Sequence, residues 1–146
     1  MSPYQMSTNP AKIIALEVGE RKFKCNEDTL TAESEYFASQ LSGTWTFYTQ
    51  ADGFAFIDRD GDMFEHILRF MRTGIYPLFY KPKEGHDLVL YNRVLVEARY
   101  FLVGKLVSWL ESEMYYKAIT IERTSAVSPV RASRHFVDQL ERFFDA

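Results

Sequence analysis

The run Asp58-Arg59-Asp60-Gly61-Asp62 is the part of the sequence whose side chains most resemble a reactive site. Its closely spaced carboxylates could bind a hard cation such as calcium. A calcium loop of the EF-hand type that begins at Asp58 needs glycine in sixth place and glutamate in twelfth. Those places hold Met63 and Arg69, so the run does not predict an EF-hand.

Asp58 and Asp60 could also act as a pair of catalytic carboxylates, which would make the protein an enzyme. No nucleophile or accessory histidine with a defined role stands near them in the sequence, so this is the weaker alternative. Two other roles suit the run better: capping of a helix together with a structural salt bridge, and a polar contact between subunits. Both roles are compatible, because Asp60 can cap while Asp58 and Arg59 face a neighbouring copy.

Other groups capable of metal or redox chemistry stand alone. His66, His86 and His135 are not spaced to share a metal ion. The single cysteine, Cys25, excludes an internal disulfide and any zinc site that needs two thiolates from this chain. We therefore expect no catalytic residue, no metal and no cofactor.

The composition is typical of a globular protein with one domain. The chain has 146 residues, of which 47% are hydrophobic and 16% aromatic, enough for the core of one domain. The net charge of −3 offers no general attraction to nucleic acid or to anionic membranes, so we expect neither as a partner. Neither a signal-peptide pattern nor a membrane-spanning apolar run appears, so we expect a soluble protein of the cytoplasm or nucleus.

The charged run is expected to join a buried strand to an amphipathic helix. Residues 54–57 are mostly apolar and aromatic, as in a short buried strand. Asp62 and Glu65 have the spacing of a capping box, and Gly74 is expected to end the helix. The apolar face of this helix is predicted to consist of Phe64, Ile67, Leu68 and Met71.

Upstream of the run, the pattern predicts a hairpin and a short helix. Residues 12–18 and 21–25 alternate as two strands, and Gly19-Glu20 suits a type II′ turn between them. Residues 26–30 read as a capped turn. Ser34 is expected to cap a short helix that contains Phe37.

Downstream, the pattern predicts an irregular segment at 75–85 and then helices. The first helix spans about 86–100, and its apolar stripe is expected to contain Leu88, Tyr91, Leu95 and Ala98. Gly104 precedes a further helix that reaches Met114. Residues 115–122 alternate as a strand would, and the alternative is that the preceding helix continues through Tyr116. The predicted class is α+β, with a small three-stranded sheet flanked by clustered helices.

These features together resemble the BTB/POZ domain, over about residues 12–112. The residues that carry the resemblance are Ile14-Ala15-Leu16-Glu17-Val18-Gly19, Phe23, Thr29-Leu30, Ser34 with Phe37, Phe56-Ile57-Asp58-Arg59-Asp60-Gly61, Phe64, Ile67-Leu68-Arg69-Phe70, Arg72-Thr73-Gly74, Glu97-Ala98-Arg99-Tyr100-Phe101 and Leu106-Val107. The nearest branch looks like the KCTD type, related to the tetramerisation domain of voltage-gated potassium channels. Two stretches, 41–45 and 85–87, look more like single-domain BTB proteins of filamentous fungi.

Three departures from the family's pattern stand out. Glu20 replaces a second glycine after Gly19, the histidine and cysteine cluster of some channel domains is missing, and residues 75–85 replace a short Leu-Pro connection. The surface at 75–85 is therefore expected to be particular to this chain. The resemblance divides the chain into a flexible arm at 1–10, a BTB/POZ domain at 11–114 and a C-terminal extension at 115–146.

The resemblance implies a non-enzymatic module that associates with itself in four or five copies or as a dimer. Some such proteins link a substrate to a cullin ubiquitin ligase, and the alternative is a co-regulator of transcription or chromatin. The candidate residues for the contact between copies are Asp58, Arg59, Asp60 and Arg72.

Aromatic side chains outside the predicted regular elements are candidates for binding a partner. They are Trp45, Phe47, Tyr48, Phe79 and Tyr80. Anchoring of loops to the core is the other role open to them. The C-terminal extension is predicted to comprise a linker at 124–131 and an amphipathic helix at 133–145, whose apolar face carries Phe136, Leu140, Phe143 and Phe144. That face could fold back onto the domain or dock on a neighbour.

Overall fold

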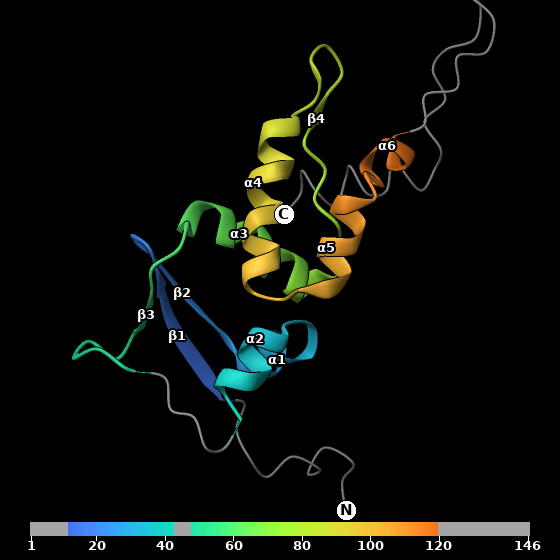
Figure 1. Cartoon of the computed structure of the whole chain (residues 1–146). Helices are drawn as coiled ribbons and strands as arrows, with labels where there is room; N and C mark the ends of the chain where they lie inside the picture. Colours follow the sequence, from blue (N-terminus) through green and yellow to red (C-terminus); the bar gives the residue numbers. More distant parts are fainter. Residues whose placement is uncertain (1–11, 43–47, 120–146) are drawn as a thin grey trace, which may run out of the picture.

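The computed structural model of the chain describes residues 12–42 and 48–119, and in these ranges a small sheet packs on helices (Figure 1). The three-stranded sheet has the order β2-β1-β3, with β1 in the centre. The predicted α+β class with a three-stranded sheet is confirmed. The predicted arm at 1–10, Trp45, Phe47 and the C-terminal helix face lie outside the described residues.

The predicted hairpin is present. Strands β1 (Ile13–Val18) and β2 (Arg21–Asn26) pair antiparallel in register. Gly19 takes a φ of +59°, as the first position of the turn requires, and its N–H donates to the carbonyl oxygen of Ile57 at 2.9 Å. The short strand β3 (Ala55–Ile57) pairs parallel to β1.

The connection between β2 and β3 contains two short helices. A long connection is needed here because β3 pairs parallel to β1. Helix α1 (Glu27–Glu33) stands where the sequence predicted only a capped turn. Helix α2 (Glu35–Gln40) begins as predicted, because the Ser34 hydroxyl oxygen accepts the N–H of Phe37 at 3.1 Å. The same hydroxyl donates to the carbonyl oxygen of Phe101 at 2.6 Å, which ties this helix to a distant part of the chain.

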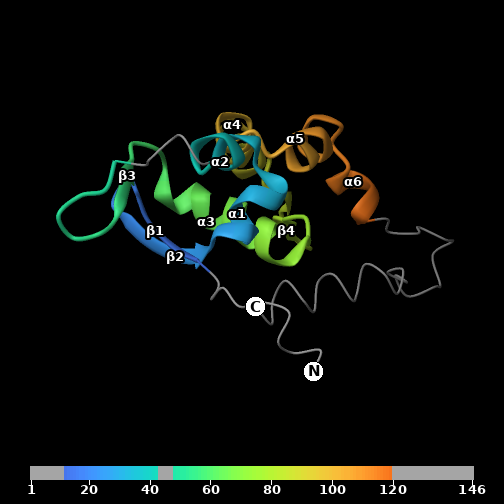
Figure 2. The same cartoon turned by 90° about the horizontal axis from the view of Figure 1, so that it is seen from below.

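The remaining helices lie on one side of the sheet (Figure 2). Helix α3 (Gly61–Thr73) buries its predicted apolar face and ends at Gly74, which has a φ of +71°. Helices α4 (Leu88–Tyr100), α5 (Gly104–Glu111) and α6 (Tyr115–Ala118) follow. The fully buried side chains at the centre of the core include Leu16, Leu30, Phe37, Phe64, Ile67, Val94, Phe101 and Leu106.

Three predictions about the second half of the chain are wrong. The segment 75–85 is not wholly irregular, since β4 (Tyr80–Lys81) and β5 (Gly85–His86) form a small antiparallel hairpin. Leu88 is 47% exposed and lies outside the buried stripe of α4. Residues 115–118 form a separate helix after a turn in which Glu113 has a φ of +52°, not a strand or a continuation of α5.

The two faces of the sheet have different surroundings. Alternate residues Leu16, Val18, Cys25, Ala55 and Ile57 are buried under the helices. The opposite face carries no helix in the described part of the chain, and there Ile13 is 57% exposed and Phe56 47% exposed. We call this second surface the outer sheet face and define it as Ile13, Ala15, Glu17, Lys22, Lys24, Phe54 and Phe56.

Candidate functional site

Asp60 caps helix α3. Its Oδ1 accepts the backbone N–H groups of Asp62 at 3.1 Å and Met63 at 3.2 Å. The predicted capping box of Asp62 with Glu65 is therefore wrong, because the helix begins two residues earlier. Asp60 Oδ2 also accepts from the Arg93 guanidinium at 3.0 Å. Partial burial raises the pKa of the Asp60 carboxyl, but these hydrogen bonds outweigh burial and hold it below its usual value.

Arg59 joins the same turn to helix α4. Its Nε and Nη2 donate to the two carboxylate oxygens of Glu97 at 3.0 and 2.9 Å. Glu97 is only 6% exposed, and the guanidinium also lies 4.2 Å from the centre of the Tyr100 ring. The hydrogen bonds that Arg59 donates to Glu97 raise the pKa of Arg59. A buried carboxylate is thus neutralised by a bidentate partner.

Gly61 is fixed by close packing. A Cβ atom at this position would overlap the carbonyl oxygen of Val18, which is backbone and cannot move aside cheaply. A Cβ atom on Gly19 would likewise lie 2.5 Å from the carbonyl oxygen of Arg59. The two turns therefore touch backbone to backbone, and only glycine permits that approach.

A second cluster of charges links the hairpin to α3. Arg21 donates to Glu65 at 3.0 Å and to Asp62 at 3.3 Å, and Glu65 also pairs with Arg69. The hydrogen bond from Arg21 lowers the pKa of Glu65. Sequence analysis missed Arg21, Arg93 and Glu97 as partners, because the pairs are separated by 33 to 44 residues and no local spacing marks them.

The four candidates for a contact between copies differ in whether they already bind a partner within their own chain. Arg59 and Asp60 bind partners in their own chain, and Arg72 donates to the carbonyl oxygen of Lys24 at 2.7 Å. Asp58 is exposed and forms no ion pair within the described ranges. It directly follows strand β3, two residues after Phe56, at the point where the N–H of Arg59 donates to the carbonyl oxygen of Ile57 and the chain turns.

The aromatic candidates also separate into two groups. Tyr48 is 82% exposed, which leaves its ring free for a partner. Phe79 is 9% exposed and packs against His66 and Tyr91, with ring centres 4.9 and 5.0 Å away. Tyr80 is half-buried beside His86. Phe79 therefore anchors its loop to the core, which is the second of the two roles predicted for these aromatic residues. Burial beside that ring lowers the pKa of His66.

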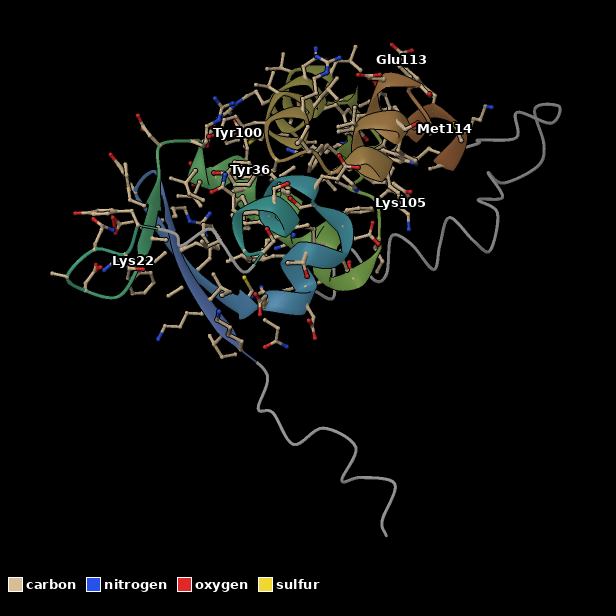
Figure 3. The ribbon with its side chains drawn as sticks, turned by 60° about the horizontal axis from the view of Figure 1, so that its bottom comes forward. Lys22, Tyr36, Tyr100, Lys105, Glu113 and Met114 are labelled. Atoms are coloured by element: carbon tan, nitrogen blue, oxygen red, sulfur yellow. The ribbon has the colours of Figure 1, made fainter. Side chains whose placement is uncertain are left out.

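The outer sheet face combines apolar and cationic side chains. Lys22 Nζ lies 4.7 Å and Lys24 Nζ 5.9 Å from the centre of the Phe54 ring. Lys22 also pairs with Asp52 at 3.4 Å. Figure 3 shows Lys22 at the sheet end of the molecule, far from Glu113 and Met114 at the helical end. This surface is suited to contact with another protein, since the exposed ring of Phe56 and the half-buried ring of Phe54 are flanked by charges.

The described residues contain neither a metal site nor a membrane-spanning helix. No cluster of three or more histidine, cysteine or acidic side chains in that part of the chain could hold a metal ion. None of the helices between residues 12 and 119 is both long and apolar enough to cross a membrane.

Comparison with known proteins gives a family. Residues 14–110 match the BTB/POZ domain. An uncharacterised protein of Dictyostelium discoideum is 32% identical over 78% of this chain and 14% of its own length. The FH protein interacting protein FIP2 of Arabidopsis thaliana is 35% identical over 53% of this chain and 27% of its own length. An uncharacterised protein of Caenorhabditis elegans is 33% identical over 72% of this chain and 38% of its own length.

The chain thus spans well under half the length of these three relatives. They do not test the predicted affinity to the KCTD branch or to fungal single-domain proteins, which stays a prediction.

Proposed function

The chain belongs to the BTB/POZ domain family, whose members are protein–protein interaction modules, and from this we propose that it works by binding copies of itself and a second protein. Domains of this type typically self-associate and are generally not enzymes. The match over residues 14–110 is the observation that carries the proposal. The alternative of an Asp58 and Asp60 active site gains no support, because Asp60 is engaged in capping α3 and in pairing with Arg93.

The outer sheet face is the surface that we propose for contact between copies. A sheet normally buries both faces or keeps one polar. Here Ile13 and Phe56 remain exposed opposite the helices. Asp58, which is exposed and forms no ion pair in the described ranges, directly follows the strand that carries Phe56. A second copy seated on this surface would cover the apolar side chains and offer partners to Asp58.

Replacement of Phe56 by glutamate is expected to weaken self-association about 10- to 100-fold, since a buried phenylalanine contributes about 1.5–3 kcal/mol. Light scattering after size-exclusion chromatography, over a range of micromolar concentrations, measures the effect. The control is Val89→Glu, which introduces the same charge at a 71% exposed position on helix α4. A monomeric unmodified chain, or equal loss in both variants, would contradict this role of the outer sheet face.

The number of copies is proposed as four or five, with a dimer as the alternative. This number comes from the resemblance to the KCTD branch. Native mass spectrometry of the purified chain counts the copies directly, and a single species of some other size would remove the proposal.

The proposed second partner is a cullin scaffold, which would place the protein in the cytoplasm or nucleus. The resemblance to the KCTD branch supports this, and the exposed Tyr48 offers an anchor. A pull-down with the N-terminal region of a cullin is expected to retain the chain, and Tyr48→Ala is expected to weaken retention about tenfold or more if this ring is a hot spot. Failure of the unmodified chain to bind any cullin tested would remove the cullin role while leaving self-association intact.

A further inference from the structure

A surface pocket lies between the β4–β5 hairpin and the start of helix α4. It has a volume of about 500 Å³ and lies at the segment where the chain departs from the family's pattern. Leu78, Phe79 and Leu90 supply apolar lining, and Tyr80 and His86 supply ring surfaces. The charged side chains at its edge are Lys81, Glu84 and Asp87.

The pocket is held in shape by its own hydrogen bonds. The Tyr91 hydroxyl oxygen accepts the N–H of Phe79 at 2.9 Å, and the same hydroxyl lies within hydrogen-bond distance of His86 Nδ1, 3.0 Å away. The N–H of Asp87 donates to the carbonyl oxygen of Phe79 at 2.8 Å. In the described ranges every buried side-chain nitrogen and oxygen has a partner. The apolar part of the pocket's lining suits a hydrophobic segment of protein.

The chain leaves the described body beside this pocket. Tyr115 of helix α6 stacks on Tyr91 with ring centres 3.8 Å apart and an angle of 6°. Tyr115 and Tyr116 both contact the His86 ring, at 5.2 and 5.0 Å. Helix α6 thus packs against His86, which lines the pocket. The described residues end at Ile119, directly after this helix.

The sequence that follows is suited to occupy the pocket. Phe136 comes 17 residues after Ile119, and Phe136, Leu140, Phe143 and Phe144 have the spacing of one helical face. A random-coil chain of 17 residues would span about 20–25 Å on average. A tethered segment within reach has an effective concentration in the millimolar range, so modest affinity is enough for occupancy. Acidic and basic side chains are equal in number in residues 131–146, so the segment has no net charge when histidine is neutral. The charged edge of the pocket therefore does not repel it as a whole.

We propose that the apolar face of residues 131–146 binds in cis in the pocket between the β4–β5 hairpin and helix α4. The bound segment would cover the rings of Tyr80 and His86 and the side chain of Leu90. Because helix α6 carries the tether, the segment would also hold α6 against Tyr91.

Hydrogen–deuterium exchange of the full chain tests whether the segment occupies the pocket. The double variant Leu140→Asp and Phe143→Asp is expected to raise exchange of the amides at 79–87 about tenfold, which is about 1.4 kcal/mol. The control is Arg142→Asp, which changes net charge equally but stands on the opposite side of the predicted helix. A pocket-side variant, Leu90→Glu, is expected to match the double variant. Equal exchange in all these proteins overturns the proposal.

Carbodiimide cross-linking of the unmodified chain tests whether the contact is within one copy. The reaction joins Lys81 to a carboxylate of the segment, such as Glu141 or Asp145, only when the two are in contact. In a mixture of ¹⁴N-labelled and ¹⁵N-labelled protein, binding in cis gives cross-linked peptides of a single isotope. Mixed-isotope peptides would show that a second copy supplies the segment, and the absence of any such cross-link would show that the segment lies elsewhere; either result overturns binding in cis.

Discussion

Replacement of Gly61 by alanine is expected to lower the free energy of unfolding by about 3 kcal/mol, at the upper end for overpacking in a rigid site. The added Cβ would overlap the carbonyl oxygen of Val18 and also approach Arg21 Cβ at 2.9 Å. Relief would require helix α3 to move away from strand β1, which would disturb the cap at Asp60 as well. Urea denaturation followed by circular dichroism measures the change.

The matched control is Gly104→Ala. Gly104 is the first residue of helix α5, as Gly61 is the first of α3, but a Cβ atom there would meet nothing within 4 Å. Alanine at this position should be neutral or stabilise by up to about 1 kcal/mol, because it restricts the unfolded chain. Both variants need the same protein concentration, since self-association would add to apparent stability. Equal effects of the two changes would contradict the packing described for the Gly61 turn.

Arg59→Ala is expected to cost about 3 kcal/mol of unfolding free energy, because it leaves the Glu97 carboxylate buried without its cation. Glu97 is 6% exposed and both of its oxygens accept from Arg59. Removal of both charges, in Arg59→Met with Glu97→Leu, should cost less than Arg59→Ala alone, since no unpaired charge remains. The same urea titration measures all three proteins.

Arg99→Ala is the control for the Arg59 prediction. Arg99 also makes two hydrogen bonds to one glutamate, Glu111, at 3.1 and 3.0 Å, but both side chains are about half exposed. Exposed pairs contribute at most about 1 kcal/mol, so this change should be small. If the two arginine variants lost similar stability, burial of Glu97 would not be the deciding factor.

Self-association and the stability of the strand–helix junction can be separated by these variants. Asp60, Arg59 and Gly61 all have partners within one copy, so their replacement is expected to act on folding first. Phe56 on strand β3 and Asp58 just after it are both exposed, and their replacement is expected to act on association. One short run of sequence thus holds residues that stabilise the fold next to residues that we propose for the contact between copies.

Local features of this protein could be predicted from the sequence. The Ser34 cap, the apolar face of helix α3 and its end at Gly74 were all correct, because each depends on residues within one or two turns of one another. The hairpin of β1 and β2 was also correct, because alternation and a glycine turn set its register locally. The α+β class then followed from the order of these elements along the chain, and the BTB/POZ fold from the resemblance of specific residues to that family.

The tertiary structure alone decided which charges are paired and which rings are buried. Arg59 meets Glu97 across 38 residues and Asp60 meets Arg93 across 33, and no spacing in the sequence could indicate either pair. Phe79 lies in the core although its segment has no helical or strand period, because Tyr91 and His66 close over it. Periodicity reports the geometry of the backbone, whereas these contacts depend on how separate elements pack against each other.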